Sequence, residues 1–306
     1  MCRKPTMCGC LRSVYNAIMQ PKQLTLVGLG LMGGSLARRL SQQGYTIQAI
    51  DLDKAALAQA HNDGVITAGY TSLAACGPDI NWIILATPVR TILSQLADLP
   101  SLFPAGCWIM DLGSTKVDIC RAMEALPRTF SAIGGHPMCG KETGGYASSD
   151  ASLFDGQTFV LSPNRRTSPP LRAAAQTLVG AVGARPLEMS PSDHDAIVAY
   201  TSHLPYLLSA GLVRSAAGAA QSEQNLWPVS ASGFRDTSRL AGTNAAVMLD
   251  ILLTNREAVL AALDAHAEEL LAVRGLLEAG AEESLLAWLE AAKNSYLQYR
   301  REKFDD

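Results

Sequence analysis

The stretch Val27-Gly28-Leu29-Gly30-Leu31-Met32-Gly33-Gly34 decides the fold, because it joins a short apolar run at 24–27 to a segment with helical patterning. It predicts a strand, a phosphate-binding turn and a helix. Gly28 permits the tight turn, Gly30 lets the backbone approach a pyrophosphate, and Gly33 lets the helix pack close to its strand. The N–H groups at the start of the helix, at Leu31 and Met32, then face the phosphates. The turn therefore predicts a dinucleotide site.

A second strand is expected at 46–50, and Asp51 follows it about 20 residues after the glycines. A carboxylate at that position binds both hydroxyls of a ribose. Because it would repel a 2′-phosphate, Asp51 predicts NAD as the cofactor, with NADP as the less favoured possibility. Lys54 is the nearest cation that would argue for NADP, and it is equally explained as a solvated residue of the next helix.

Composition limits the class of protein. The chain has 306 residues, enough for about two domains, and a formal net charge of −3, which disfavours nucleic acid and membrane surfaces as partners. No apolar run approaches the roughly 20 residues of a membrane span. The seven cysteines, an odd number without paired metal-ligand spacing, lie at positions 2, 8, 10, 76, 107, 120 and 139. We expect reduced thiols in a cytoplasmic protein without a metal site.

Residues 1–21 are expected to form a disordered extension, because they lack the apolar core of a signal peptide. Met19 immediately precedes the first strand and would make a natural start. Cys2, Cys8 and Cys10 lack the fourth ligand that a metal site would need.

Residues 22–190 alternate between strand and helix patterns, as in a doubly wound α/β sheet of the Rossmann type. Beyond the first two strands, further ones are expected at 82–86, 108–110, 132–133, 159–161 and 186–189. Residues 191–306 show no convincing strand and predict an all-helical domain. It begins at Ser190-Pro191-Ser192-Asp193, which combines a cap residue, a proline in the first turn and an acid.

The helical domain is rich in apolar residues at helical spacing. Part of that surface is expected to be buried against a second subunit, giving a homodimer. A self-contained bundle core would explain most of the same leucines.

His136 is the best candidate for catalysis, inside Gly134-Gly135-His136-Pro137-Met138-Cys139-Gly140. The glycines let the backbone come close to a ligand, and the loop is expected to follow the carboxyl end of a strand, where sheets of this type bind ligands. A neutral imidazole there accepts the proton of a hydroxyl as hydride leaves its carbon. A satisfied surface histidine is the alternative.

Ser114 follows another expected strand and offers a hydroxyl at the same edge, either to orient substrate oxygen or the nicotinamide amide, or to cap the next helix. Thr87 and Pro88 end the strand before it and are expected to form part of the nucleotide pocket wall.

Three polar residues stand out in the helical half. His203, within Ser202-His203-Leu204-Pro205, lies on a helix that Pro205 is expected to bend. Arg235 and Arg239 are four residues apart, so on a helix they face the same way and form a site for a dianion. The alternative for the arginines is two solvated charges paired with Asp236.

Taken together, the chain resembles the prephenate and arogenate dehydrogenase family of tyrosine biosynthesis, from about residue 23 to the last helix. The most specific elements are G-G-H-P-M-x-G at 134–140, S-H-L-P at 202–205 and G-F-R-D-T-S-R at 233–239. The resemblance implies a Rossmann-like NAD(P) domain followed by a helical domain through which two subunits dimerise. It also implies that His136 is the catalytic histidine, assisted by Ser114. His203, Arg235 and Arg239 would contact substrate, and Glu142 would lie near the mouth of the pocket.

The chain departs from the family pattern at two positions. Ala245 follows Asn244 where many members have a proline, and Met248 stands where some relatives have an aromatic residue. These departures leave open how a partner subunit contacts the pocket.

The reaction that the resemblance implies is the oxidative decarboxylation of prephenate, of arogenate, or of both. Hydride leaves the ring carbon for NAD, His136 takes the hydroxyl proton, and loss of carbon dioxide restores an aromatic ring. An acidic neighbour would favour the ammonium group of arogenate, and Asp193 and Asp195 are candidates for it. With the form of the arginine motif, they incline the expectation towards arogenate.

Two other functions are weighed. A β-hydroxyacid dehydrogenase has a similar glycine turn, but those enzymes use a lysine of the helical domain, and this chain has none between Lys141 and Lys293. A non-catalytic NAD-sensing module would not need His136, Ser114 and two arginines.

Overall fold

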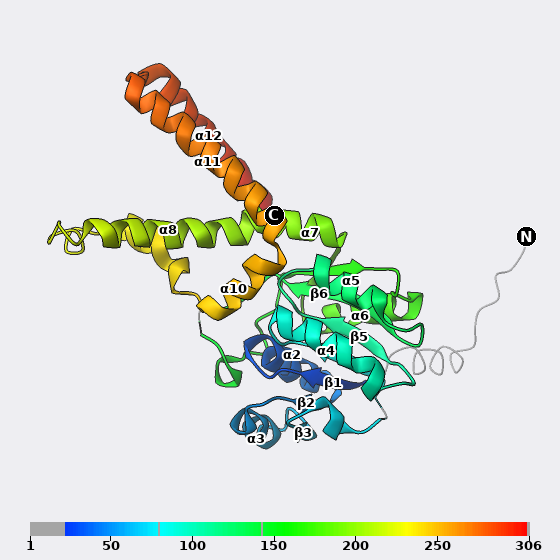
Figure 1. Cartoon of the computed structure of the whole chain (residues 1–306). Coiled ribbons are helices and arrows are strands. Elements are labelled where there is room, and N and C mark those ends of the chain that lie inside the picture. Colours follow the sequence, from blue (N-terminus) through cyan, green and yellow to red (C-terminus); the bar gives the residue numbers. More distant parts are fainter. Residues whose placement is uncertain (1–21, 79, 142, 305–306) are drawn as a thin grey trace, which may run out of the picture. The chain divides into compact units, whose positions relative to one another are not determined.

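The computed structural model describes residues 22–78, 80–141 and 143–304 (Figure 1). The expected extension at 1–21 therefore lies outside the described residues. The chain divides into two compact units, one up to Asn255 and one from Arg256.

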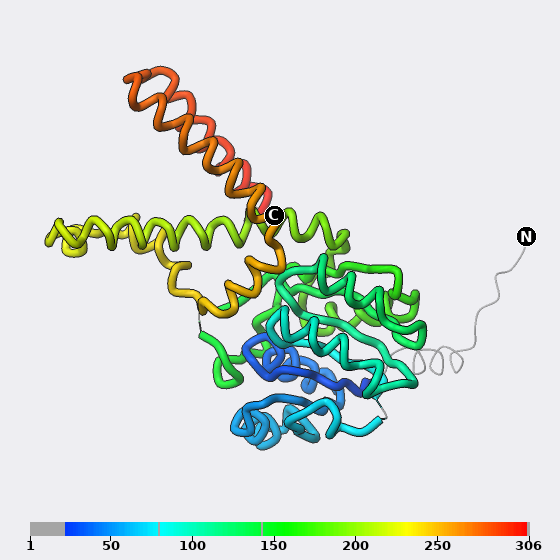
Figure 2. The backbone as a smooth tube through the Cα atoms, in the orientation of Figure 1, coloured from blue at the N-terminus to red at the C-terminus, as the bar shows by residue number. Residues whose placement is uncertain are grey.

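The first unit contains an eight-stranded sheet in the order β3-β2-β1-β4-β5-β6-β7-β8. The strands are β1 (Gln23–Val27), β2 (Thr46–Ile50), β3 (Ala68–Tyr70), β4 (Trp82–Leu85), β5 (Trp108–Asp111), β6 (Ser131–Pro137), β7 (Thr158–Pro163) and β8 (Arg185–Glu188). The connecting helices are α2 (Leu31–Gln42), α3 (Lys54–Asn62), α4 (Val89–Leu102), α5 (Val117–Ala125) and α6 (Pro169–Ala181), with short 3₁₀ turns at Leu73–Cys76 and Tyr146–Ser148. Figure 2 follows this alternation of strand and helix along the backbone.

The direction of the strands changes once. β1 to β6 are all parallel, β6 pairs with β7 antiparallel, and β7 pairs with β8 parallel. The predicted doubly wound sheet is thus confirmed, with its last two strands running the opposite way. β1 has β2 on one side and β4 on the other, so chain connections leave in opposite directions at the β1–β4 boundary. Open α/β sheets bind their ligands at the carboxyl ends of such strands.

The core lies on both faces of this sheet. Strand β4 shows the arrangement, since Trp82 and Ile84 join one apolar cluster while Ile83 and Leu85 join the other. This alternation follows the two-residue period of a strand. Because both faces are covered, the strand reads as a continuous apolar run, as parallel strands do.

After residue 190 the described residues form helices joined by turns and contain no strand, as expected. In the first unit these helical elements are α7 (Pro191–Val198), a π-helical turn (Ala199–His203), α8 (Leu204–Ala219), α9 (Ser232–Ser238), a 3₁₀ turn (Arg239–Gly242) and α10 (Ala245–Thr254). Ser190 caps α7 by accepting from the N–H of Asp193 at 3.0 Å. The π turn directly precedes Leu204 and Pro205, where the missing proline N–H and its ring would disturb a regular α-helix.

The helix from Pro191 to Ala219 is long and apolar enough to cross a membrane, judged by length and composition, and 28% of its most apolar window is buried. Its first half carries His194, Asp195 and His203, which are 1%, 3% and 1% exposed. Buried polar groups with protein partners are typical of a helix packed inside a protein.

The second unit is a helical hairpin of α11 (Arg256–Ala279) and α12 (Glu282–Phe304). Trp288 donates from Nε1 to Glu269 Oε2 at 3.0 Å across the hairpin. Many of its leucines are exposed, among them Leu270, Leu271, Leu277, Leu286 and Leu289. Such an apolar surface is typical of a protein–protein interface.

Candidate active site

The glycine turn has the geometry of a dinucleotide site. Gly28 adopts φ +99°, and a Cβ there would lie 2.7 Å from the carbonyl oxygen of Ala86. A Cβ on Gly33 would lie 2.0 Å from the oxygen of Gly28, so α2 can approach the turn only with glycine at this position. Gly30 differs, because a Cβ there would meet no atom within 4 Å. Packing within the chain therefore requires the first and third glycines, and the second faces open space where a pyrophosphate would lie.

Leu31 and Met32 begin α2 and are half-buried, and no side chain caps the helix. The N-terminal amides of α2 are thus placed for phosphate oxygens.

Asp51 follows β2 and braces the glycine turn. Its Oδ2 accepts from the N–H of Leu29 at 2.5 Å, and its Oδ1 accepts from the N–H of Asp53 at 2.8 Å. Each carboxylate oxygen keeps capacity for a further donor such as a ribose hydroxyl. Lys54 is an exposed residue of the first turn of α3, which agrees with the alternative that it is a solvated residue of that helix.

Thr87 and Pro88 lie after β4 beside Gly28. The methyl of Thr87 lies 3.1 Å from where a Cβ on Gly28 would be, and its hydroxyl donates to Gln95 Oε1 at 2.8 Å. Pro88 is the N-cap residue of α4. Both therefore line the carboxyl edge of the sheet next to the glycine turn.

His136 lies within β6, one residue before its end, where a loop after a strand was expected. The prediction of a loop was wrong because the adjacent glycines serve packing. A Cβ on Gly135 would lie 2.5 Å from the backbone oxygen of Asp111, and one on Gly134 would lie 2.9 Å from the sulfur of Cys120. The position of His136 at the carboxyl edge, beside the end of β5, is as predicted.

A chain of hydrogen bonds runs inward from His136. Its Nδ1 lies 2.8 Å from Nε2 of His194, and Nδ1 of His194 lies 2.7 Å from Oδ1 of Asp195. The carboxylate of Asp195 also accepts from the N–H groups of Lys116 at 2.7 Å and Val117 at 2.8 Å, which caps α5.

This series of hydrogen bonds assigns the tautomers of His136 and His194. Asp195 is an acceptor, so Nδ1 of His194 carries the proton and its Nε2 accepts from Nδ1 of His136. Nε2 of His136 then carries a lone pair and has no hydrogen-bond partner among the described residues. The arrangement leaves a base at the carboxyl edge of the sheet.

Burial lowers the pKa of His136 well below its ordinary value, and electrostatic interactions with His194, Lys116 and His203 lower that pKa further. His136 as a whole residue is nevertheless partly exposed. At neutral pH the imidazole is uncharged, as a proton acceptor must be.

His203 is fully buried next to the same network. Asn255 donates from Nδ2 to the backbone oxygen of Asp195 at 2.8 Å and lies 3.1 Å from Nδ1 of His203. Burial lowers the pKa of His203 to about 4, although Asp195 acts in the opposite direction. His203 thus lies in the layer behind His136, with Nδ1 held by Asn255.

A buried ion pair lies beneath the catalytic edge. Lys116 Nζ pairs with Asp111 Oδ2, and both side chains are 0% exposed. Asp111 also accepts from the N–H of Gly113 at 2.7 Å and from that of Gly135 at 3.1 Å. Burial raises the pKa of Asp111 in spite of Lys116 and these amides.

Ser114 is half-buried in the turn between β5 and α5, and its hydroxyl makes no hydrogen bond to another described residue. It does not cap α5, whose N-cap residue is Lys116 and whose first amides bind Asp195. Of the two roles considered for Ser114, the capping role is therefore excluded.

The arginine motif lies apart from the histidine chain. Arg235 is on α9, its side chain is 77% exposed, and its Nε donates to Asp236 Oδ1 at 3.0 Å. Arg239 begins the following 3₁₀ turn and is also exposed. This turn packs on α8, where Ala241 donates its N–H to Ser209 Oγ at 2.9 Å. Glu142 lies outside the described residues.

The acids expected to bind an ammonium group have other partners. Asp195 is occupied by His194 and two backbone amides, and Asp193 accepts from the hydroxyl of Ser190 at 2.7 Å in the cap of α7.

Sequence reasoning missed His194, Lys116 and Asp111 as parts of the site. The available signal was the position of Lys116 in D-L-G-S-T-K, since a lysine directly after an expected strand and before a helix faces the sheet edge. Nothing in the sequence joins His194 to His136, which are 58 residues apart.

A Rossmann-type sheet with a glycine turn, an acid after its second strand and a hydrogen-bonded histidine at its carboxyl edge is typical of an NAD-dependent dehydrogenase with a helical second part. Residues 36–188 match the family model described as prephenate dehydrogenase, nucleotide-binding domain, and residues 190–291 match prephenate dehydrogenase, dimerization domain. The chain belongs to the prephenate dehydrogenase family.

Individual relatives agree with this assignment. The chain is 32% identical to a prephenate dehydrogenase of Bacillus subtilis over 279 residues, which cover 89% of this chain and 74% of the relative. A prephenate dehydrogenase from A. aeolicus, solved with hydroxyphenyl propionate and NAD+, superposes with a TM-score of 0.84 at 29% identity, covering 90% of this chain and 98% of that one.

An arogenate dehydrogenase from Synechocystis gives a TM-score of 0.79 at 27% identity and covers 90% and 99% of the two chains. The chain is therefore an NAD-dependent oxidoreductase that carries out an oxidative decarboxylation. Neither the β-hydroxyacid dehydrogenase nor the NAD-sensing module is favoured.

Proposed function

We propose that this chain oxidises and decarboxylates prephenate with NAD, and that the same site accepts arogenate. The observation that carries the proposal is the hydrogen-bonded chain from His136 through His194 to Asp195, ending in a free Nε2 at the carboxyl edge of the sheet. We expect the site to accept both substrates, because the carboxylates of Asp193 and Asp195 already have partners and are not free to select the ammonium group of arogenate. We therefore expect no strong preference for arogenate.

In the proposed mechanism, Nε2 of His136 takes the proton of the ring hydroxyl, and Ser114 orients the same oxygen. Bound NAD supplies the acceptor for the hydride of that ring carbon. The charge gained by His136 is shared through His194 with the carboxylate of Asp195. Carbon dioxide then leaves, and the ring becomes aromatic, so the chain needs mainly to orient the substrate and hold one proton.

The cofactor site is proposed at Gly28, Gly30, Leu31, Met32 and Gly33, with Thr87 and Pro88 as its wall. Asp51 is proposed to bind the ribose hydroxyls and to favour NAD over NADP. The open space at Gly30 supports this placement.

Arg235 and Arg239 are proposed to bind substrate carboxylates, with His203 and Glu142 near the pocket. Both arginines are exposed on the face of the helical part that carries α9. A dianionic substrate needs cations, and a guanidinium binds a carboxylate through two parallel hydrogen bonds.

The domains are proposed to be 22–190 for NAD binding and 191–306 for substrate binding and dimerisation. The exposed leucines of the α11–α12 hairpin support a homodimer. A cytoplasmic location is proposed from the reduced thiols of the described cysteines, Cys76, Cys107, Cys120 and Cys139.

Steady-state kinetics with prephenate and arogenate, each with NAD and NADP, test the proposal. We expect kcat/KM values for the two substrates within about tenfold of each other, a difference of about 1.4 kcal/mol or less, and a clear preference for NAD. Activity on arogenate alone would contradict the breadth that we propose.

Arg239→Ala is expected to raise KM for either substrate about tenfold or more, since a charge-assisted hydrogen bond contributes about 1.5–3 kcal/mol. Arg239→Lys keeps the charge but loses the planar fork, and it should also bind substrate poorly. An unchanged KM in both variants would remove Arg239 from the site.

A further inference from the structure

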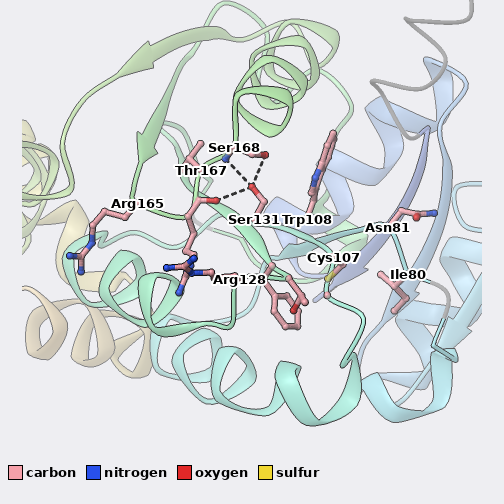
Figure 3. Close-up of a pocket in the computed structure, with 13 residues that line it drawn as sticks. Ile80, Asn81, Cys107, Trp108, Arg128, Ser131, Arg165, Thr167 and Ser168 are labelled. Atoms are coloured by element: carbon pink, nitrogen blue, oxygen red, sulfur yellow. Dashed lines mark hydrogen bonds between the residues drawn. The ribbon is translucent and has the colours of Figure 1, made fainter.

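A cavity lies at the opposite edge of the sheet from His136. Its volume is about 770 Å³, and it opens at the amino ends of β4, β5 and β6, where Asn81, Trp108 and Ser131 line it (Figure 3). Since these strands are parallel, their amino ends lie a full strand length from the carboxyl edge that carries the catalytic histidine. Neither the cofactor turn nor the histidine chain contributes to this cavity.

Three arginines line the cavity, and they differ in their partners. Arg165 is held by Glu124, with contacts from its backbone N–H at 3.1 Å and its Nε at 2.9 Å. Arg128 has no hydrogen bond or ion pair within the described residues. The Nε of Arg166 is buried and also has no hydrogen-bond partner there. Among the described residues, Arg128 is thus left without a carboxylate, and Arg166, whose charge acts on Glu124 together with that of Arg165, keeps a buried Nε without a hydrogen-bond partner.

The loop that carries Arg166 is fixed in position. The N–H of Arg166 donates to Asn164 Oδ1 at 2.8 Å, and its carbonyl oxygen accepts from the hydroxyl of Ser131 at 2.9 Å. Thr167 donates its hydroxyl to the oxygen of Ala132 at 2.7 Å. The bonds to Ser131 and Ala132 tie the loop to β6, and Figure 3 draws the hydrogen bonds of Ser131. A site whose backbone is already ordered loses less entropy when it binds a ligand.

Part of the remaining lining is apolar, beside the polar residues Asn81, Thr129, Ser131, Thr167 and Ser168. Ile80, Cys107 and Phe130 line the cavity with only 7%, 7% and 3% of their surfaces exposed, and Trp108 adds an aromatic ring. A cation pair next to an apolar floor suits a molecule that carries an anionic group on an apolar body, because the arginines bind the anion and the floor removes apolar surface from water.

We propose that this cavity binds a small organic anion, a carboxylate or phosphate joined to an apolar ring or chain, with Arg128 and Arg166 as its anion ligands. The site is separate from the site of the dehydrogenase reaction and does not require that site to be occupied.

Isothermal titration of the full chain with phenyl phosphate, benzoate and inorganic phosphate tests the proposal. We expect saturable binding of at least one of the two aromatic anions, and comparison of the two identifies the anionic group preferred. Inorganic phosphate, which lacks the apolar body, should bind at least tenfold more weakly than phenyl phosphate. Equal affinities for these two phosphates, or no saturable binding of either aromatic anion, would overturn the proposal.

Variants locate the binding. Arg128→Gln and Arg166→Gln should each weaken it about tenfold or more. Arg121→Gln is the matched control, because Arg121 is an exposed arginine of α5 that pairs with Asp118 outside the cavity. Equal weakening in all three variants, or in none, would overturn the proposal.

Arg239→Ala, which removes a proposed carboxylate ligand of the active site, should leave the affinity for the aromatic anion unchanged, whereas loss of binding in this variant would place the anion in the active site and overturn the proposal. Thermal denaturation of each variant checks that it is folded. Arg128 is exposed, so its substitution provides the test even if Arg166→Gln is unstable.

Discussion

Replacing Asp195 by asparagine tests whether the buried hydrogen-bond chain holds the catalytic base in its active form. The carboxylate is 3% exposed and accepts three hydrogen bonds, from His194 Nδ1 at 2.7 Å, the N–H of Lys116 at 2.7 Å and the N–H of Val117 at 2.8 Å. An amide offers one acceptor oxygen and a donor NH₂ group. Whichever way the amide is turned, its NH₂ group therefore faces at least one N–H donor.

The expected loss of stability follows from these contacts. A hydrogen bond to a charged group contributes about 1.5–3 kcal/mol, and a buried donor left without an acceptor adds its own desolvation cost. The free energy of unfolding of Asp195→Asn should therefore fall by about 2–4 kcal/mol.

The effect on catalysis has a different origin. If the amide donates to Nδ1 of His194, the proton of that ring moves to Nε2, and Nδ1 of His136 becomes the acceptor. Nε2 of His136 then carries a proton and cannot accept one from substrate. Loss of a positioned general base lowers kcat by about 10²–10⁴-fold, while KM should change little because Asp195 is buried behind the histidines.

The assay is steady-state kinetics at saturating NAD, combined with thermal denaturation. Asp193→Asn is the control, because it removes the same charge two residues away from an exposed carboxylate whose side-chain partner is Ser190. It should retain nearly all of kcat. If Asp195→Asn keeps kcat within about threefold of the unmodified protein while its stability falls as expected, the proposed role of the Asp195–His194–His136 hydrogen bonds in holding the base is refuted.

Other predictions concern the cofactor turn and pH. Gly33→Ala should destabilise the fold, because its Cβ would lie 2.0 Å from a backbone oxygen, whereas Gly30→Ala should fold normally but bind NAD more weakly; thermal denaturation and NAD titration of the pair check this. Asp51→Ser should shift preference towards NADP, measured as the ratio of kcat/KM for the two cofactors, and equal use of both by the unmodified chain would contradict the role of Asp51. Because the folded-state pKa of His203 is lowered to about 4, the unfolded state binds more protons between pH 6.5 and 4, so stability is lost as pH falls through this window. Urea denaturation should show a loss of about 2 kcal/mol from this group between pH 7.5 and 5, and a pH dependence in His203→Asn as steep as in the unmodified chain would contradict it.

The sequence predicted much of the sheet, because buried parallel strands appear as short apolar runs. It missed β3, which has three residues, one of them glycine, and no apolar run. It also gave no direction for β7. Between β6 and β7 the described residues contain only a 3₁₀ turn at Tyr146–Ser148, and parallel neighbours need a longer crossover, usually a helix. The short connection therefore returns the chain antiparallel.

The geometry of the glycine turn and the place of Asp51 beside it could be predicted because they are local in sequence: one turn and one acid about 20 residues later. The histidine chain could not, because it depends on packing of α7 against α5. Asp195 was considered as a partner for an ammonium group, but in the structure the N-terminus of α5 and His194 occupy it. A carboxylate beside a helix N-terminus and an imidazole is held more strongly than a surface acid, and only the fold shows that the three meet.

The hydrogen bonds of Asp111 explain why a charge is buried at the edge of β5 and β6. Burying an ion pair such as Asp111 and Lys116 gives little net stability, since desolvation offsets the attraction. The same carboxylate, however, accepts from the N–H of Gly113 and from the N–H of Gly135, the residues directly before Ser114 and His136. One buried group thus fixes the backbone of both proposed catalytic residues relative to each other. Lys116 balances its charge and helps to keep His136 neutral. We therefore explain the Asp111–Lys116 pair by its effect on the position and the protonation state of His136.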